Sequence, residues 1–260
     1  MPAILYIVAT PIGNLQDVTL RALEILKRVS VVYAEDTRVT RKLFERFEIA
    51  TPIKSYHQHS GSRGVREVIE ALRHGDAALV TDAGTPGVAD PGNELIEEVM
   101  KALRHEGIKI IPVPGASAVT AAASISGFNM SRFCFLGYVP KKKGRKRFFE
   151  EVAKSDMPVI LYETPHRIIK TLEELHAAFT SSREESFNRV QGKLGGTEGS
   201  LHSLRSVGMT VRGDGRRVVV CRELTKLFES IYRGTIEEVL EQVRKDPVKG
   251  EYVVVVDKSS

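Results

Sequence analysis

Thr81–Gly92 (TDAGTPGVADPG) directly follows the apolar run Ala77–Val80 and decides how we interpret the fold. This stretch holds three glycines, two prolines and two aspartates in twelve residues, which is more than a simple turn requires. Glycine lets the main chain approach a ligand closely, and proline fixes a loop before any ligand arrives. Because ligands of parallel α/β sheets bind at the carboxyl ends of strands, we favour a ligand-binding loop over a structural turn.

Short apolar runs alternate with helix-period stretches on both sides of this loop. In Thr19–Val29, for example, Ala22, Ile25 and Leu26 fall on one helical face. The rhythm predicts the α/β class with a mostly parallel sheet. The expected strands are Ile4–Ala9, Val31–Ala34, Ile53–Tyr56, Ala77–Val80 and Lys109–Val113, and the helices between them are Thr19–Val29, Arg38–Phe47, Arg63–Arg73 and Asn93–His105.

A second domain is expected to begin after residue 113, where two prolines bracket a strand exit, so we divide the chain into residues 1–113 and 114–260. The βα pattern continues there, with strands at Phe133–Val139, Val159–Tyr162, Arg217–Arg222 and Glu251–Val256 and helices at Ser117–Ser126, Lys146–Ala153, Arg167–Phe179 and Ile236–Arg244. Residues 180–215 are rich in Ser, Gly and Arg without sustained periodicity, which predicts a mobile insertion.

Three further strand exits carry small or polar residues. Thr10–Asp17 contains Asn14 and suits either a ligand wall or a turn that leads into a helix capped by Asp17 or Thr19. Pro114–Ala118 suits either a site where helix amides bind a ligand or a plain helix start.

The third exit, Ala34–Arg38, pairs the carboxylates of Glu35 and Asp36 with a guanidinium. Such a set provides a proton acceptor and a phosphate ligand. The structural alternative is that Asp36 or Thr37 caps the next helix while Arg38 is solvated, and the sequence leaves both readings open.

The formal net charge of the chain is +5, and its distribution is uneven. Lys141–Arg147 (KKKGRKR) places six positive charges in seven residues, just after Pro140. A solvated basic loop and a phosphate-binding surface explain this run equally well on charge alone.

Neither a metal site nor a membrane segment is predicted. Cys134 and Cys221 each lie in an apolar run and are expected to be buried reduced thiols, and His57 and His59 have no partner ligand nearby. The N-terminus lacks the features of a secretory signal, and no apolar run approaches the ~20 residues that span a bilayer. We expect a cytoplasmic protein.

Taken together, these loops closely resemble the 16S ribosomal RNA cytidine 2′-O-methyltransferases of the tetrapyrrole methylase superfamily. The resemblance covers residues 3–178 and 216–257. Its motifs, in chain order, are Ala9–Leu15 (ATPIGNL), Glu35–Arg38 (EDTR), Asp82–Gly87 (DAGTPG), Asp90–Gly92 (DPG), Tyr162–Arg167 (YETPHR), Arg222–Lys226 (RELTK) and Gly250–Val254 (GEYVV).

The resemblance implies two α/β domains with S-adenosyl-L-methionine in a cleft between them, usually in a homodimer. It implies 16S rRNA of the 30S ribosomal subunit as the substrate. The residues that it places around the methyl donor are Asp82, Gly84, Pro86, Gly87, Pro114, Gly115, Ala116, Ser117, Leu136, Tyr162, Glu163, Leu224 and Thr225.

Loop position and residue type suggest the groups that act on the RNA. We expect Asp36 and Glu35 to act as the base or to orient it, and Asn14 to orient the ribose. The expected phosphate contacts are Arg38, Lys142, Arg145 and Arg147.

Three other functions compete with this one. A tetrapyrrole methyltransferase of the same superfamily would need an apolar cleft of macrocycle size rather than a basic rim. A non-catalytic RNA-binding protein would not need the Thr81–Gly92 loop. A nicotinamide dehydrogenase is disfavoured because the G-x-G-x-x-G fingerprint is absent.

Overall fold

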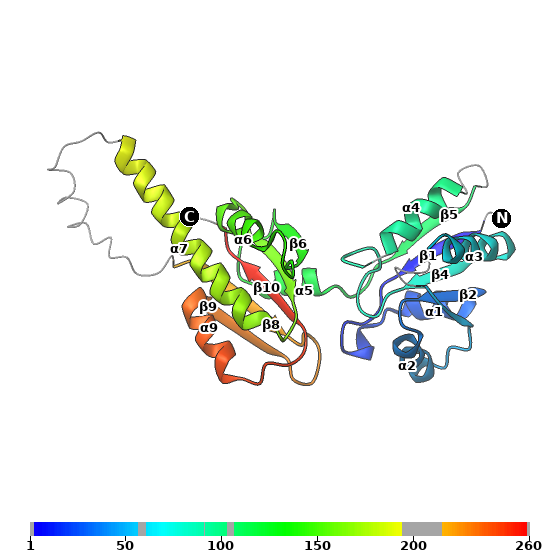
Figure 1. Cartoon of the computed structure of the whole chain (residues 1–260). Helices are drawn as coiled ribbons and strands as arrows, with labels where there is room; N and C mark the ends of the chain where they lie inside the picture. The colour runs from blue at the N-terminus through cyan, green and yellow to red at the C-terminus, as the bar shows by residue number, and fades with distance from the viewer. Residues whose placement is uncertain (1–2, 57–60, 91, 103–106, 194–214, 259–260) are drawn as a thin grey trace. The chain divides into compact units, whose positions relative to one another are not determined.

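The computed structural model describes residues 3–56, 61–90, 92–102, 107–193 and 215–258. The chain divides into two compact units, Met1–Ala118 and Val119–Ser260, each with its own five-stranded sheet (Figure 1). The division falls between residues 118 and 119, whereas the sequence suggests 113 and 114. The difference arises because Pro114–Ser117 packs on loops of the first unit, as shown below.

The sheet of the first unit is entirely parallel, as the alternation of elements predicts. Its order is β3-β2-β4-β1-β5, and each observed pair of neighbours is parallel. The strands are β1 (Ile4–Val8), β2 (Val31–Ala34), β3 (Ile53–Ser55), β4 (Ala77–Val80) and β5 (Lys109–Val113), and the helices are η1 (Leu15–Asp17), α1 (Leu20–Arg28), α2 (Thr37–Phe47), α3 (Gly61–His74) and α4 (Gly92–Ala102).

Helices cover both faces of this sheet, because each strand alternates its side chains between two apolar layers. Leu26 of α1 and Phe44 of α2 pack with Val8 and Val32 on one face. Leu72 of α3 and Leu95 of α4 pack on the other face. The result is a three-layer α/β/α unit, and Figure 1 shows the helices flanking the sheet.

The second unit is also α/β, but its sheet is mixed rather than mostly parallel. The order is β6-β7-β10-β8-β9, in which β6 and β7 are parallel and the other neighbours are antiparallel. The elements are α5 (Ala118–Ile125), β6 (Cys134–Tyr138), α6 (Arg145–Lys154), β7 (Val159–Glu163), α7 (Ile168–Lys193), β8 (Arg217–Arg222), β9 (Ser230–Thr235), α9 (Ile236–Lys245) and β10 (Tyr252–Val256).

The sequence missed β9, and this omission explains the wrong expectation of a continued parallel pattern. A turn rather than a helix joins β8 to β9, so the two strands pair antiparallel along their length. β9 contains Gly234 and lies at the sheet edge, and its alternation is too weak to stand out. Helices α6, α7 and α9 pack together on one face of this sheet around Leu172, Val220 and Val239.

Part of the expected insertion is helical. Helix α7 continues to Lys193, so the prediction that residues 180–193 lack regular structure is wrong. The first half of α7 is anchored by buried Leu172, Leu175 and Phe179, and elongating an existing helix costs far less than starting one. Residues 194–214 lie outside the described part of the chain.

The two cysteines are free thiols, as expected. Cys221 on β8 is fully buried, and this burial raises its pKa to about 12. Cys134 on β6 is half-buried. Within the described residues, no helix is both long and apolar enough to cross a membrane.

Candidate functional site

The carboxyl ends of β1, β2, β4 and β5 meet at one edge of the first sheet, because all four strands run parallel. The loops that leave β1 and β4 are bound to each other there. Thr10 N donates to Gly84 O at 2.9 Å, Gly84 N donates to Thr10 O at 3.0 Å, and Thr10 Oγ1 donates to Thr81 O at 3.0 Å. The Thr81–Gly92 loop is therefore held in place by the first strand exit.

A carboxylate cluster forms where the β2 and β4 loops meet. Asp82 Oδ1 accepts a hydrogen bond from the Asp36 backbone N–H at 2.9 Å. Thr81 Oγ1 donates to Glu35 Oε2 at 2.8 Å. The structure thus brings Asp82 together with the predicted site residues Glu35 and Asp36, although Asp82 lies 46 positions after Asp36 in sequence.

Asp36 has a structural task in this cluster. It is the N-cap of α2, accepting from Arg38 N at 2.8 Å, and its carboxylate also pairs with the Arg38 guanidinium at 2.6 Å. The hydrogen bonds from Arg38 lower its pKa from 3.8 to about 2. A carboxylate of such low basicity is a weak proton acceptor near neutral pH, which argues against Asp36 as the base.

The glycine–proline loop is braced by its own residues. Gly84 and Gly87 have φ values of 85° and 87°, a region that favours glycine. Asp90 Oδ1 accepts hydrogen bonds from Gly87 N and Gly92 N, both at 2.7 Å. Asp90 Oδ2 is buried and has no hydrogen-bond partner among the residues that the structure describes. Pro91 is not one of these residues. Such an acceptor requires a donor from a ligand or from water.

The Pro114–Ser117 segment lies beside this loop. Ala9 N donates to Val113 O at 3.1 Å, and a Cβ on Gly115 would lie 3.0 Å from the Cβ of Ala9. Thr85 Oγ1 donates to Ala116 O at 3.4 Å. The loops that leave β1, β4 and β5 therefore contact one another in one wall, and the binding of a ligand there stays a prediction.

Asn14 is exposed and caps η1, accepting from Gln16 N at 3.0 Å. Thr19 caps α1, accepting from Ala22 N at 3.1 Å. The helix-cap alternative for this loop is therefore seen, and the role of Asn14 toward a ribose stays a prediction.

The residues of the second unit that the sequence predicts to contact the methyl donor come from one edge of its sheet. Tyr138 pairs in register with Tyr162, Glu163 pairs with Tyr252, and Tyr252 pairs with Arg222, so the exits of β6, β7 and β8 lie together. Leu136 packs against the core on the helix-covered face, and Leu224 is buried. Their contact with a donor stays a prediction.

The turn after β8 has an unusual backbone. Glu223 and Thr225 have φ values of 52° and 66°, although neither is glycine. Lys226 Nζ donates to Glu223 Oε1 at 2.8 Å, and Glu251 N donates to the same oxygen at 2.9 Å. Burial raises the pKa of Glu223, but these hydrogen bonds outweigh it and lower the pKa overall. The ionised carboxylate therefore holds the turn against the start of β10.

Glu163 does not contact solvent, because it is the centre of a buried ion network. Its side chain is 0% exposed; Oε1 lies 2.7 Å from Arg167 Nη2, and Oε2 accepts from Thr171 Oγ1 at 2.6 Å and lies 3.9 Å from Arg145 Nη1. A buried carboxylate is tolerated when it is paired and hydrogen-bonded in this way. These contacts give the Glu163 side chain a structural role, and the predicted contact of this residue with the methyl donor stays a prediction.

Arg145 is likewise an interior residue, although the sequence placed it among the RNA contacts. Its side chain is 9% exposed and bonds Glu174 Oε2, Thr171 Oγ1 and the Pro140 carbonyl at 2.6, 2.8 and 3.0 Å. The buried position at the start of α6 explains the error, because charge density alone does not show which cation turns inward. The other cations of the run, Lys141, Lys142, Lys143, Lys146 and Arg147, are exposed.

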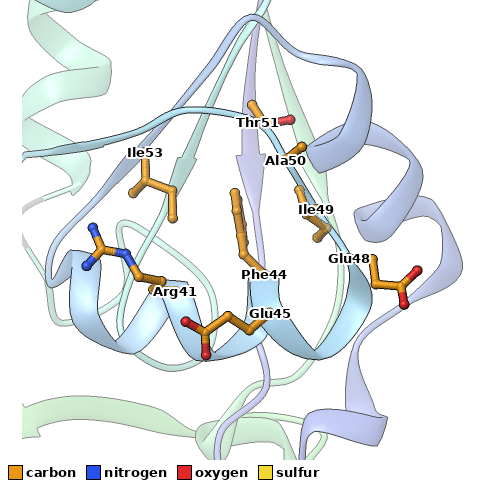
Figure 2. Close-up of a pocket in the computed structure, with 8 residues that line it drawn as sticks. All are labelled: Arg41, Phe44, Glu45, Glu48, Ile49, Ala50, Thr51 and Ile53. Atoms are coloured by element: carbon orange, nitrogen blue, oxygen red, sulfur yellow. The ribbon is translucent and has the colours of Figure 1, made fainter.

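A pocket of about 530 Å³ lies at the opposite edge of the first sheet (Figure 2). It is formed by the second half of α2 and the residues that lead into β3 at its amino end. Figure 2 shows Phe44 and Ile53 beside it, with Glu45 and Arg41 at its rim. The sequence did not predict this pocket, and none of the predicted site residues lines it.

In the described ranges, no three His, Cys, Asp or Glu side chains form a group that could hold a metal ion. His57 and His59 lie outside those ranges.

Comparison with known proteins identifies the family of this chain. The family model of the Tetrapyrrole (Corrin/Porphyrin) Methylases matches residues 4–240. The chain therefore belongs to the tetrapyrrole methylases, and it is a methyltransferase with S-adenosylmethionine as its methyl donor.

The chain is also similar to individual proteins, two of which are relatives in sequence and one of which is a solved structure. The chain is 38% identical over 97% of its length to a protein of Halalkalibacterium halodurans named "Ribosomal RNA small subunit methyltransferase I", 75% of which it covers. A protein of the same name from Thermotoga maritima is 34% identical, with 97% of both chains covered. A cobalt precorrin-4 methyltransferase of known structure has the same fold, with a TM-score of 0.62 at 17% identity over 98% of this chain and 94% of that one.

Replacing Arg145 with methionine should lower the free energy of unfolding by about 3–5 kcal/mol, because it leaves Glu163 buried without one of its two cations. The matched control is Arg147→Met, which removes an exposed guanidinium from the same helix and should change stability by less than about 0.5 kcal/mol. Urea denaturation measures both. Equal effects of the two substitutions would contradict the buried network.

Asp36 should contribute to stability in a pH-dependent way. Its folded pKa of about 2 lies below the ordinary 3.8, so the contribution is present above about pH 4 and is lost as the pH falls toward 2. Asp36→Asn keeps a capping side chain but cannot titrate. The difference in melting temperature between the parent and this variant should be constant above pH 5 and shrink between pH 4 and 2. A difference that does not change with pH would exclude the ionised cap.

Proposed function

We propose that this protein methylates the 2′-hydroxyl of a cytidine ribose in 16S rRNA of the small ribosomal subunit. The observation that carries the proposal is near-full-length similarity, at 34–38% identity, to several proteins named ribosomal RNA small subunit methyltransferase I. Two structural features support it: a carboxylate cluster at the strand exits and an exposed cationic run after β6.

The residues of the first unit suit the methyl donor. S-adenosylmethionine carries an ammonium group and ribose hydroxyls, which donate hydrogen bonds to carboxylate oxygens. Asp82 and the Oδ2 atom of Asp90, which has no partner among the described residues, supply such oxygens. We assign the donor to the wall formed by residues 82–87 and 114–117. S-adenosylmethionine supplies an electrophilic methyl group on a sulfonium. Leu136, Tyr162, Leu224 and Thr225 remain candidate contacts in the second unit.

The chain's own part in the reaction is to activate and orient the ribose hydroxyl. We assign the general base to Glu35, which is half-buried and is held by Thr81 Oγ1. Asp36 orients the loop through its bond to Arg38, and Asp82 holds the backbone of that loop. A positioned base contributes a ~10²–10⁴-fold factor, and orientation contributes up to ~7–11 kcal/mol in favourable cases.

We assign phosphate binding to the exposed cations. Lys142 and Arg147 are exposed near the β6 exit, and the Arg38 side chain is 84% exposed despite its pairing with Asp36. An exposed ion pair is weak, so the Arg38 guanidinium is able to exchange its partner for a phosphate. Arg145 is left out of this set because it is buried.

The proposal includes a cytoplasmic location and a homodimer, which fit the ribosomal substrate and the family resemblance. A tetrapyrrole substrate is the alternative from the same family. The cluster of exposed lysines speaks against it, because a macrocycle needs apolar contacts while RNA needs phosphate contacts.

Purified protein should transfer a tritiated methyl group from S-adenosylmethionine to 30S subunits that lack the modification. Alkaline hydrolysis should then stop at one cytidine, because a 2′-O-methyl group blocks attack on the adjacent phosphate. Glu35→Gln should lower the single-turnover rate by ~10²–10⁴-fold. The matched control is Glu45→Gln on the exposed side of α2, which should leave the rate unchanged. Label on a base, or transfer to a tetrapyrrole instead, would refute the proposal.

Lys142→Ala and Arg147→Ala should each weaken RNA binding and lower the slope of log K against log salt by about 1, because each removes one phosphate contact. Glu150→Gln serves as a control that changes the charge nearby without removing a cation. Fluorescence anisotropy at several salt concentrations gives the slopes. Slopes equal to that of the parent would remove both residues from the interface.

A further inference from the structure

Tyr138, at the end of β6, is the exposed tyrosine of this chain. Its side chain is 51% exposed, while the other six tyrosines are buried or half-buried. A single exposed apolar residue is common on protein surfaces and needs no explanation by itself. What sets Tyr138 apart is how firmly it is held and what surrounds it.

The Tyr138 ring is held by aromatic contacts. Tyr138 packs edge-on against Tyr162, with ring centroids 5.3 Å apart, and Phe135 packs on the same ring at 4.9 Å. Gly137, with a φ of 68°, turns the strand just before Tyr138 and interrupts the regular register with β7. Edge-to-face contacts restrain the ring, and about half of the residue remains exposed to solvent.

The backbone that follows Tyr138 is pinned by the buried ion network. Val139 N donates to Tyr162 O at 3.3 Å, and Arg167 Nη1 donates to Val139 O at 2.9 Å. Arg145 Nη1 donates to Pro140 O at 3.0 Å. Both arginines also pair with Glu163. The backbone that follows Tyr138 is therefore tied to the buried ion network.

The residues next in sequence are cationic. Lys141, Lys142 and Lys143 are all exposed and follow Tyr138 by three to five positions. A restrained aromatic ring followed closely in sequence by exposed lysines suits single-stranded RNA, since proteins stack its bases on aromatic rings and bind its phosphates with cations. A ring already held in place loses little conformational freedom on binding.

We propose that Tyr138 is a base-stacking residue that binds an unpaired nucleotide of the RNA substrate. The inference rests on the proposed function and deepens it, because it assigns to the second unit a role in recognising a base as well as phosphates. Stacking does not depend on the phenolic hydroxyl and releases no counterions. It therefore has a signature different from that of the lysines.

Binding of a short fluorescein-labelled oligocytidylate tests the proposal. Tyr138→Ala should weaken binding roughly 5- to 150-fold, the equivalent of ~1–3 kcal/mol for one stacked base. Tyr138→Phe should bind within about 3-fold of the parent, because the ring remains. The salt slope of Tyr138→Ala should equal that of the parent, in contrast to Lys142→Ala. Leu20→Ala, which removes an 80% exposed side chain from the first unit, should have no effect.

Two further measurements distinguish loss of base stacking from loss of folding and from loss of methyl-donor binding. Tyr138→Ala should unfold cooperatively with a melting temperature at most a few degrees below that of the parent, because only one edge-to-face contact with Tyr162 is lost, and calorimetry should show unchanged affinity for S-adenosylmethionine. Parental RNA affinity in Tyr138→Ala, or equal losses in the Ala and Phe variants, would overturn the proposal. A loss of affinity for S-adenosylmethionine instead would make Tyr138 a contact of the methyl donor and would overturn the proposal as well.

The same experiments distinguish this proposal from the proposed function. If the parent methylates 30S subunits while Tyr138→Ala binds RNA normally, only the stacking role fails. If the parent neither binds nor methylates RNA, the proposed function fails with it.

Discussion

Parallel pairing of β1, β2, β4 and β5 is the constraint on which the candidate site depends. Parallel strands end at the same edge, so the loops that leave them meet, although they are spread over more than a hundred residues of sequence. The bridge between Thr10 and Gly84 and the bond from Asp36 N to Asp82 are consequences of this arrangement. Antiparallel pairing of any of these strands would send its loop to the opposite edge.

The second unit depends on a different interaction, the burial of the Glu163 carboxylate. An ion removed from water needs opposite charges and hydrogen bonds, and here Arg145, Arg167 and Thr171 provide them. The same arginines bond the carbonyls of Val139 and Pro140. The network around this carboxylate thus holds Arg145 in the interior, while the other cations of the run are exposed.

Local electrostatics separates two adjacent carboxylates that look equivalent in sequence. Asp36 caps a helix and pairs with Arg38, which holds its pKa at about 2, whereas Glu35 accepts one hydroxyl hydrogen bond from Thr81. The first is suited to holding a loop and the second to accepting a proton. Position in the loop relative to the helix N-terminus makes the difference, because the backbone N–H groups of α2 point at residue 36.

The sequence by itself determined the α/β class, the elements of the first unit and the loop of glycines and prolines, because periodicity and backbone preference are local properties. It missed β9, which pairs with β8, and the helical residues 180–193, which continue α7. Only the tertiary structure showed that the side chains of Arg145 and Glu163 are buried in one ion network, and that Tyr138 is exposed. Burial and ion pairing join residues distant in sequence, so no local pattern reveals them.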